Sequence, residues 1–446
     1  MKKNDVITLE ITGMTAEGNG VGRYEGMAVF VPLTAPGDVI QALIVKVKKT
    51  YAYGKLQTVI TASQSRCEAD CDSFSRCGGC VYRHISYDAE SAIKQDRVRD
   101  AIQRIGGFDK EPEPIISAIS PDRYRNKAQY PIAPDGSMGF FAVHSHRIIS
   151  CDDCMLQPTQ FTEVTDIVSK WIRKNNISIY NELTHTGLLR HLYLRRGFAT
   201  GELMVVLVIN GISLPFAEEL IADLRIKFGD DLKSVQINEN RENTNVILGD
   251  KCTVLYGEAY ITDILCDVKV RISPLSFYQV NRDMAEVLYR KAAEYADAQG
   301  KDILDLYCGA GTIGLSMANS AKSIIGVEIV PQAIEDAKIN AKQNGIENAR
   351  FICADAAAAA VMLAQEGIEP KVVIVDPPRK GCSAELLSVI ANDFAPERIV
   401  YVSCDPATLA RDAANLREYG YELQEYTPVD LFPRTSHVET VAYFIK

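Results

Sequence analysis

The sequence predicts an α/β protein whose C-terminal part is a doubly wound sheet, preceded by an α+β region and a small N-terminal β-barrel. Three observations carry this prediction. Beyond residue 280, apolar strand patterns alternate regularly with helical patterns. The first of these strands runs into a glycine-rich turn, as in many cofactor-binding sheets. Residues 1–60 instead show short strand patterns separated by glycines, which is typical of a small closed barrel of the OB type.

The composition is that of a soluble globular protein. Hydrophobic residues make up 47% and charged residues 24% of the 446 residues. No apolar run approaches the roughly 20 residues that a membrane-spanning helix needs, and the first residues lack the pattern of a signal peptide. We therefore expect a cytoplasmic protein with no membrane partner. The net charge of −10 argues against a nucleic-acid partner, but residues 1–66 hold eight basic and five acidic residues and are locally positive.

Residues 1–60 are expected to form the barrel, with a glycine-rich turn at residues 18–22. The stretch Val45–Tyr53 mixes lysines with tyrosines, which suits a surface that holds phosphates and stacks bases. The same pattern also fits an edge strand whose lysines prevent aggregation. The expected strands are Val6–Ile11, Met27–Val31, Val39–Val47 and Leu56–Ile60.

Twelve cysteines are many for a reducing compartment, and four of them crowd together. Such a cluster indicates metal or iron–sulfur ligation rather than disulfides. The cluster consists of Cys67, Cys71, Cys77 and Cys80, and it could form a local four-thiolate zinc site. The scattered cysteines are expected to be small buried hydrophobes; they are Cys252, Cys266, Cys353 and Cys382.

Residues 61–275 are expected to form an α+β domain. Its loops are rich in arginine, at residues 123–127, 144–147 and 190–196. Such runs are either solvated faces or, with aromatic residues between them, RNA contacts. The expected helices are Asp88–Ile105, Thr162–Asn175 and Phe216–Phe228, and the expected strands are Ala199–Asn210 and Leu232–Asn238.

Residues 276–446 are expected to form the doubly wound sheet, with an antiparallel final strand. Helices are expected at Thr312–Asn319 and Pro331–Asn344. The expected strands are Asp302–Tyr307, Ser323–Glu328, Arg350–Cys353, Val372–Asp376, Arg398–Ser403 and Val438–Ile445.

Acidic side chains at the ends of four successive strands indicate the kind of cofactor. Asp305 lies just before the glycines Gly309 and Gly311, where it would repel a pyrophosphate. Glu328 can bind both hydroxyls of a ribose, and Asp355 lies near the expected place of an adenine amino group. With Asp376, these acids suit S-adenosylmethionine, which carries a sulfonium and an ammonium and no phosphate.

Cys404 and Glu439 predict chemistry at C5 of a pyrimidine. C5 of uracil is a poor nucleophile, so a thiolate must first add to C6, and a base must later remove the C5 proton. Cys404 supplies the first group and Glu439 the second. Enzymes that methylate exocyclic amines carry an aromatic residue after Asp-Pro-Pro, whereas this chain has Arg379 there. Cys308 and His437 are assigned to packing.

Together these motifs resemble the bacterial 23S rRNA (uracil-5-)-methyltransferases of the TRAM-domain type, whose shorter relatives are the tRNA uracil-5-methyltransferases. The resemblance covers nearly the whole chain. It implies a TRAM barrel at residues 1–60, a central iron–sulfur domain at 61–275 and a Rossmann-like, S-adenosylmethionine-dependent methyltransferase domain at 276–446. The matching motifs, in order, are DLYCGAGTIGL, GVEIVPQAI, DPPRKG, VSCDPATLARD and HVETVA.

The resemblance also implies roles for single residues. Cys404 is the nucleophile and Glu439 the base, and Phe277 packs on a uracil flipped out of its stack. The cofactor is lined by Gln279, Tyr307, Gly309, Gly311, Glu328, Asp355 and Asp376. A 4Fe-4S cluster is bound by Cys71, Cys77, Cys80 and Cys154, with Cys67 and Cys151 nearby.

The implied partner is RNA, namely 23S rRNA, and the implied state is a monomer. Three other functions stay open from the sequence. One is methylation of tRNA at uracil C5. Another is methylation of an exocyclic amine or a small molecule. The third is a non-catalytic RNA-binding or assembly factor that only keeps the fold.

Overall fold

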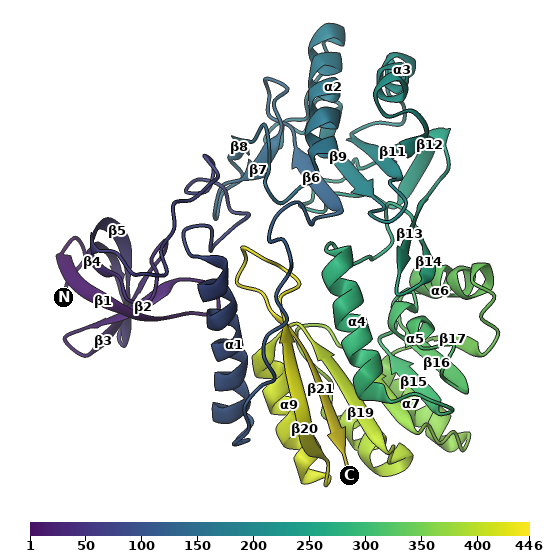
Figure 1. Ribbon diagram of the computed structural model, residues 1–446. Coiled ribbons are helices and arrows are strands. Elements are labelled where there is room, and N and C mark those ends of the chain that lie inside the picture. Colours follow the sequence, from purple (N-terminus) through teal and green to yellow (C-terminus); the bar gives the residue numbers. More distant parts are fainter.

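The first five strands close into a barrel in the computed structural model, which describes residues 1–446 (Figure 1). The order around the barrel is β1-β2-β3-β5-β4, and nine buried apolar side chains fill it. Tyr51–Tyr53 of β5 are paired on both sides, with β3 and β4, whereas Lys46 and Val47 of β4 lie beyond its pairing with β1 and pair with β5 alone, so the edge-strand alternative holds for that end of β4. The strands are β1 (Val6–Met14), β2 (Gly20–Tyr24), β3 (Met27–Val31), β4 (Val39–Val47) and β5 (Tyr51–Thr61).

The glycines of residues 18–22 serve two purposes. Gly18, with a φ of 82°, lies in the turn that the sequence predicts, whereas Gly20 and Gly22 belong to β2, which pairs with β1 and β3. A Cβ at Gly22 would lie 2.3 Å from the Glu10 carbonyl oxygen, and one at Gly20 would lie 2.9 Å from the Ile11 side chain. Gly20 and Gly22 are therefore required for the close approach of two strands.

The cysteine-rich segment, residues 66–85, contains no helix or strand and lies beside the barrel. Asp38 in the barrel accepts bonds from Arg66, and the Thr34 carbonyl lies 3.1 Å from His84 Nε2. The chain then enters α1 (Tyr87–Arg104), which begins with the Ser86 side chain capping the Ala89 amide. Val98 and Ile102 of this helix pack in the core of the C-terminal sheet, against α9 (Pro406–Glu418).

The middle region is built on a five-stranded sheet of order β12-β11-β10-β9-β6. One face is covered by α2 and α3, and the other packs against the C-terminal domain through Tyr193 and Val206. The strands are β6 (Lys127–Pro131), β9 (Leu189–Arg196), β10 (Leu203–Ile209), β11 (Leu232–Glu239) and β12 (Lys251–Gly257). The other elements are β7 (Gly139–Phe141), β8 (Ile148–Ser150), α2 (Thr159–Asn175), α3 (Ala217–Phe228), the 3-10 turn η1 (Gly229–Asp231), β13 (Ile261–Leu265) and β14 (Val268–Ile272).

Several arginines that the sequence offered as RNA contacts make internal bonds instead. Arg190 is buried and donates to the carbonyl oxygens of Asn240 and Glu242. Arg195 is buried and bonds to the Ser276 carbonyl. Arg123 pairs with Asp153 at 2.6 Å.

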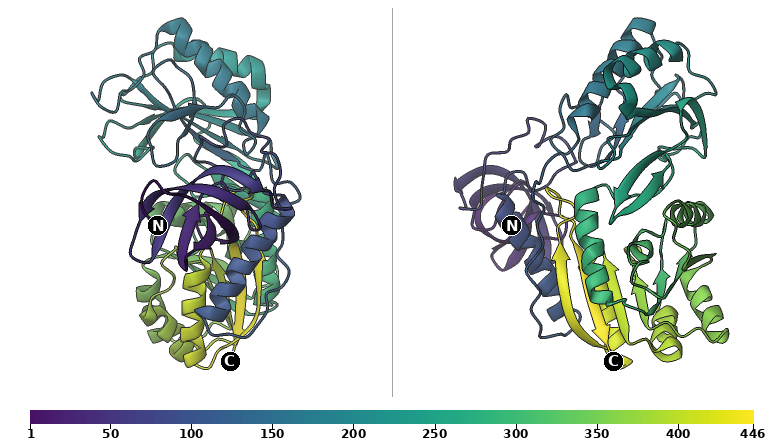
Figure 2. Two further views of the ribbon diagram at one scale, coloured as in Figure 1. Left: turned by 90° about the vertical axis from the view of Figure 1, so that its left-hand side faces the viewer. Right: turned by 45° about the vertical axis from the view of Figure 1, so that its right-hand side comes forward.

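The C-terminal domain is a seven-stranded, doubly wound sheet of order β17-β16-β15-β18-β19-β21-β20 (Figures 1 and 2). Its first five strands are parallel, and β21 runs antiparallel between β19 and β20, as the sequence predicted. The strands are β15 (Asp302–Leu306), β16 (Ser323–Glu328), β17 (Ala349–Cys353), β18 (Val372–Val375), β19 (Arg398–Ser403), β20 (Glu422–Val429) and β21 (Glu439–Ile445). The helices besides α9 are α4 (Arg282–Ala296), α5 (Thr312–Ser316), α6 (Pro331–Gln343), α7 (Ala356–Gln365), α8 (Ala384–Ser388) and the π-helical η2 (Val389–Phe394).

The scattered cysteines divide into two groups. Cys266 and Cys382 are buried, as predicted. The prediction is wrong for Cys353, which is exposed at the end of β17, and for Cys252, which is half-buried on β12 at the margin of its sheet. No helix combines the length and the hydropathy that a bilayer crossing requires.

Candidate active site

Cys404, Glu439 and Asp376 meet at one edge of the C-terminal sheet. Asp376 directly follows β18 and Cys404 directly follows β19, so both lie where parallel strands end. In the antiparallel pair β19–β21, Ser403 is opposite Thr440. The next position of this register places Cys404 opposite Glu439. Directly opposed residues have Cα atoms about 4.5–5.5 Å apart and side chains on the same face of the sheet. The register therefore brings the predicted nucleophile to the predicted base.

Burial changes the ionisation of all three groups. Glu439 is only 5% exposed, and burial, with the charge of Asp376, raises its pKa to about 8. Burial raises the pKa of Cys404 to about 11, and the charges of Glu439 and Asp376 add to this rise. The pKa of Asp376 is raised by burial to about 7. At neutral pH the site therefore favours the protonated forms of Cys404 and Glu439. A nearby cation would favour their ionised forms instead.

Arg379 is the cation that counters the effect of burial on Cys404 and Glu439. Its charge lowers the pKa of both Cys404 and Glu439. The sequence drew attention to Arg379 only because an aromatic residue was absent there. Its position directly after Asp376-Pro377-Pro378 was the signal that could have placed it in the site.

The glycine-rich turn after β15 opens onto the same edge. Gly309 has a φ of 53°, and a Cβ added there would meet nothing within 4 Å, so the backbone faces open space. Tyr307, with a φ of 66°, starts this turn. Asp305, expected to face the cofactor, is buried beneath the turn instead, where Oδ2 accepts a bond from the Gly314 amide at 2.9 Å. Burial raises its pKa to about 7, and its role is to hold the turn.

Three acids remain facing this edge without a cationic partner. Glu328 accepts bonds from the Gly309 amide at 3.2 Å and from the Val330 amide at 2.9 Å. Asp355 caps α7 by accepting from two backbone amides. The carboxylates of Glu328, Asp355 and Asp376 form no ion pair with a lysine, arginine or histidine. Such a set fits a ligand with both a sulfonium and an ammonium group, and exposed Val330 beside Glu328 offers an apolar surface to a nucleobase.

Gln279 reaches this edge from the segment before α4. Its carbonyl oxygen accepts a bond from Asn126 Nδ2 at 2.8 Å. Burial and the charge of Asp376 raise the pKa of Tyr289 on α4, and the Gln279 side chain opposes this rise, so all three groups act on one another. Sequence analysis did not identify Tyr289, since a single tyrosine on a helix face carries no signal. Phe277, two residues before Gln279, is 70% exposed and free to stack on a base.

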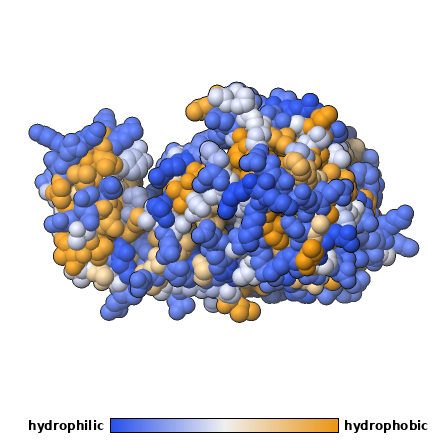
Figure 3. Space-filling view, turned by 90° about the horizontal axis from the view of Figure 1, so that it is seen from above, coloured by the Kyte–Doolittle hydropathy of each residue, from blue (hydrophilic) through white to orange (hydrophobic).

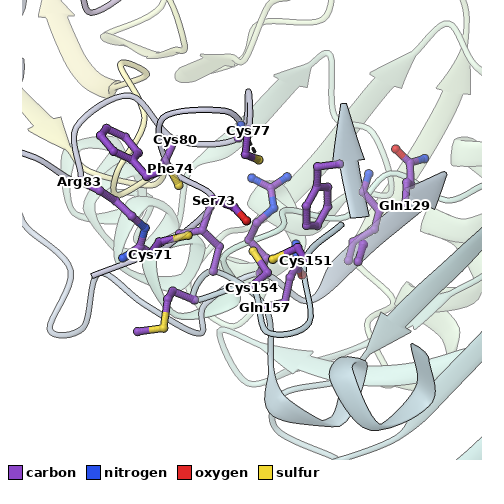
Figure 4. A pocket seen from close by; sticks show the side chains of 17 residues that line it. Cys71, Ser73, Phe74, Cys77, Cys80, Arg83, Gln129, Cys151, Cys154 and Gln157 are labelled. Atoms are coloured by element: carbon purple, nitrogen blue, oxygen red, sulfur yellow. Dashed lines mark hydrogen bonds between the residues drawn. The ribbon is translucent and has the colours of Figure 1, made fainter. Parts of the chain in front are cut away.

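A second site lies where five cysteines line a cavity of about 250 Å³ (Figure 4). Cys71, Cys77 and Cys80 come from the cysteine-rich segment, and Cys151 and Cys154 come from the loop between β8 and α2. The neighbouring Cys151 lowers the pKa of Cys154, whereas burial raises that of Cys80 to about 12.

The zinc alternative is not supported, because Cys67 does not line this cavity. Its thiol is exposed and points to the Arg83 carbonyl oxygen at 3.5 Å. No group of three or more His, Cys, Asp or Glu side chains is arranged closely enough to hold a metal ion. The five thiols that line the cavity are of the ligand type that iron–sulfur clusters use.

Comparisons with known proteins agree with this geometry. Residues 2–56 match the TRAM domain family, and residues 244–446 match the family described as tRNA (Uracil-5-)-methyltransferase. An uncharacterized RNA methyltransferase of Clostridium tetani is 45% identical over 99% of this chain and 96% of its own length. The chain belongs to the RNA (uracil-5-)-methyltransferase family. A second relative, from Halalkalibacterium halodurans, is also 45% identical, over 99% of this chain and 97% of its own.

This chain has the same fold as a solved structure, that of Pyrococcus abyssi tRNA (uracil-54, C5)-methyltransferase in complex with S-adenosyl-L-homocysteine. The identity is 29%, the TM-score is 0.80, and the match covers 98% of this chain and 100% of that one. The doubly wound domain is thus the predicted S-adenosylmethionine-dependent methyltransferase fold, and the N-terminal barrel is the predicted TRAM domain. The protein is an S-adenosylmethionine-dependent RNA methyltransferase.

Proposed function

We propose that the protein methylates C5 of a uridine in 23S rRNA through a covalent bond between Cys404 and C6 of the base. The observation that carries this proposal is the β19–β21 register, which sets Cys404 opposite Glu439 beside Asp376. Cys353 also ends a strand opposite a carboxylate, that of Glu328, but this carboxylate is only half-buried and accepts two backbone amides.

In the proposed reaction, the Cys404 thiolate adds to C6, and the electron pair of the C5=C6 bond moves toward C5. C5 then takes the methyl group from S-adenosylmethionine. Glu439 removes the C5 proton, the C5=C6 bond forms again, and the bond between C6 and Cys404 breaks. Arg379 favours the ionised forms of Cys404 and Glu439 throughout.

Binding residues align the two substrates. We assign the cofactor to Gln279, Tyr307 and the turn at Gly309 and Gly311, with the carboxylates Glu328, Asp355 and Asp376. Phe277, exposed beside this edge, stacks on the extruded uracil. Because the sulfonium is already activated, alignment supplies much of the rate.

The barrel offers a surface for the rest of the RNA. The rings of Phe30, Tyr51 and Tyr53 form a cluster with centroids 5.5 to 5.8 Å apart, and Tyr53 is 37% exposed. Exposed lysines of the β4–β5 hairpin lie beside it. Figure 3 shows the barrel as a lobe on the left, on which hydrophobic residues gather. Stacking rings next to cations suit single-stranded RNA.

We further propose that Cys71, Cys77, Cys80 and Cys154 hold a 4Fe-4S cluster in the cavity that they line. The cluster supplies a structural cross-link, since the cysteine-rich segment has no core of its own. Cys151 lines the same cavity and favours the thiolate form of the fourth ligand, because it lowers the pKa of Cys154.

tRNA is the second candidate substrate. The Pyrococcus abyssi relative is named for uracil-54 of tRNA and matches the full length of this chain. The central cysteine cavity and the TRAM domain support 23S rRNA through the resemblance in sequence. In either case we propose a cytoplasmic monomer, which light scattering of the purified protein with and without RNA checks.

The test uses 5-fluorouridine transcripts of 23S rRNA fragments and of tRNA. Fluorine at C5 cannot be removed by a base, so the covalent adduct is trapped and migrates as one band in denaturing gels. We expect the adduct with wild-type protein and S-adenosylmethionine, and none with Cys404→Ala. Cys353→Ala, a matched change at the exposed end of another strand, retains it. An adduct that survives Cys404→Ala contradicts the assignment, and the transcript that is trapped identifies the RNA class.

A further inference from the structure

The loop between β20 and β21, residues 430–438, leads directly into Glu439. We call it the base loop. It contains no helix or strand, yet six of its nine residues are hydrogen-bonded to segments elsewhere in the chain. In Figures 1 and 2 it is the yellow loop beside the upper end of α1. Glu439 is the first residue of β21 and pairs with Val429 of β20, so the sheet holds its backbone on one side and this loop fixes the chain that leads into it on the other.

A buried charge network from α1 holds the start of the loop. Lys94 Nζ donates to Asp430 Oδ1 at 2.7 Å and to the Phe432 carbonyl oxygen at 3.1 Å. The same ammonium donates to Glu90 Oε1 at 2.7 Å, and that oxygen also accepts the Arg434 amide at 2.7 Å. All three charged side chains are fully buried. Since an unpaired buried charge is strongly destabilising, the network permits one position of the loop.

The cysteine-rich segment holds the middle of the loop. The amides of Val81 and Tyr82, directly after Cys80, both donate to the Arg434 carbonyl oxygen, at 2.8 and 3.2 Å. Arg434 Nη1 donates back to the Ile85 carbonyl oxygen at 3.2 Å. Arg434 has a φ of 66°, a conformation that is unfavourable for a side chain of this size and that these bonds maintain.

Three further side chains complete the contacts. The Tyr124 hydroxyl donates to the Pro433 carbonyl oxygen at 2.9 Å, and Arg97 Nη1 donates to the Ser436 carbonyl oxygen at 2.7 Å. Asn281 Nδ2 donates to the Leu431 carbonyl oxygen at 3.0 Å. The base loop is thus fixed mainly by segments far away in the sequence, which have no part in the sheet that carries the chemistry.

We propose that α1, residues 81–85 and Tyr124 position Glu439, and that they set the rate at which the C5 proton leaves the methylated adduct. This inference rests on the proposed covalent mechanism. In that step the carboxylate takes the C5 proton, the C–H electron pair forms the C5=C6 bond, and the C6–S bond breaks to release the Cys404 thiolate. A displaced carboxylate slows this step and not the earlier ones, because Glu439 takes no proton in addition or methyl transfer, and moving its charge away from Cys404 would lower the pKa of the thiol and so favour addition.

The test variant is the double substitution Tyr124→Phe/Arg97→Met. It removes the donors to the carbonyl oxygens of Pro433 and Ser436 and keeps most of each side chain. The matched control is Tyr421→Phe/Arg417→Met. Tyr421 also donates from a buried hydroxyl to a proline carbonyl, that of Pro396 at 2.8 Å, and Arg417 also donates to a carbonyl, that of Gly107 at 3.0 Å. The substrate is uridine RNA with S-adenosylmethionine labelled in its methyl group. The readout is labelled protein–RNA adduct in denaturing gels, together with kcat and KM.

We expect the test variant to accumulate methylated adduct and to lose about tenfold in kcat, since a misplaced base loses part of a contribution of about 10² to 10⁴. KM should fall with kcat, because a step after adduct formation has become rate-limiting. The control behaves as wild type. In a second double variant, Tyr124→Phe/Arg97→Lys, the lysine keeps a donor for the Ser436 carbonyl. We expect this variant to have a higher kcat than Tyr124→Phe/Arg97→Met.

Glu439→Gln separates the two ways in which the test can fail. If Glu439→Gln accumulates no methylated adduct, the covalent mechanism itself is wrong. If Glu439→Gln accumulates adduct and the folded double variant does not, the base loop contacts serve stability only and the inference is overturned. Equal losses in adduct formation and turnover, with no accumulation, overturn it in the same way.

Discussion

At the scale of residues, the carboxyl group of Glu439 decides the pH dependence. Its pKa is raised to about 8, so at pH 7 most of it is protonated and cannot accept the C5 proton. The Cys404 thiol, with a pKa raised to about 11, also ionises more as the pH rises. We expect the single-turnover rate of methylation to increase from pH 7 to pH 9. A rate that is flat or falling over this range, with RNA binding unchanged, contradicts this assignment.

Arg379 makes a second prediction at this scale. Its cation favours the ionised forms of Cys404 and Glu439, so Arg379→Met raises both pKa values further and leaves less of each active form at neutral pH. We expect kcat/KM at pH 7 to fall about tenfold and to recover partly at higher pH. Lys380→Met removes a neighbouring exposed cation and is the control. An equal loss at every pH indicates a role in RNA binding instead.

Residue identities were predictable from the motifs, but their surroundings were not. The motifs identified Cys404, Glu439 and Glu328, and the sheet brings them to one edge. The burial of Asp305 beneath the glycine turn could not be foreseen, because a carboxylate before a turn can point to either side of it. Likewise, only the folded cysteine-rich segment shows that Cys67 turns away from the cavity while Cys151 lines it.

At the scale of elements, the turn between β15 and α5 fixes the cofactor edge. Gly311 has a φ of 79°, and a Cβ there would lie 2.9 Å from the Phe351 ring. We expect Gly311→Ala to weaken S-adenosylmethionine binding and to reduce the free energy of unfolding by about 1–3 kcal/mol. Calorimetric titration and urea denaturation measure the two effects.

Gly345→Ala is the matched control for this change. Gly345 follows α6 with a φ of 67°, and a Cβ there would meet nothing within 4 Å. It should reduce stability through backbone strain and leave cofactor affinity unchanged. If both variants weaken cofactor binding equally, general destabilisation rather than the shape of the turn explains the loss.

Elements whose apolar residues form a continuous run or recur at a regular spacing were predictable from the sequence. Elements that mix apolar with basic residues were not. The parallel strands β15, β16 and β18 are apolar runs and were found close to their bounds. β9 was missed because its sequence, LRHLYLRR, carries four basic residues that suggested a loop. They are accommodated because Arg190 and Arg195 find buried carbonyl oxygens, a compensation that local patterns do not contain.

At the scale of the whole molecule, the cysteine cavity joins segments more than 60 residues apart in the sequence. We expect Cys77→Ser to reduce the iron content from about four atoms per chain to near zero. Cleavage by trypsin after Arg76 should then become faster, because residues 71–80 contain no helix or strand and the contacts of the segment with the barrel and with Arg434 lie outside this stretch. Cys67→Ser, whose thiol points away from the cavity, should change neither property. Full iron content in Cys77→Ser would exclude this ligand set.

The division at residues 60 and 275 stays a prediction, and the packing of α1 shows what sequence alone leaves out. The helix follows the cysteine-rich segment in the chain but buries Val98 and Ile102 in the core of the C-terminal sheet. Its amphipathic pattern predicted a buried face and could not specify which domain covers it, since any apolar surface would serve.

The pairing of β19 with β21 has a consequence for engineering. A shift of β21 by one position would turn Glu439 to the opposite side of the sheet, because alternate side chains face opposite ways. Such a shift would leave the amount of secondary structure almost unchanged and would escape circular dichroism. Catalytic turnover therefore reports the register of β21 directly. In a redesigned version of this sheet, selection for activity would remove register-shifted variants without any structural measurement.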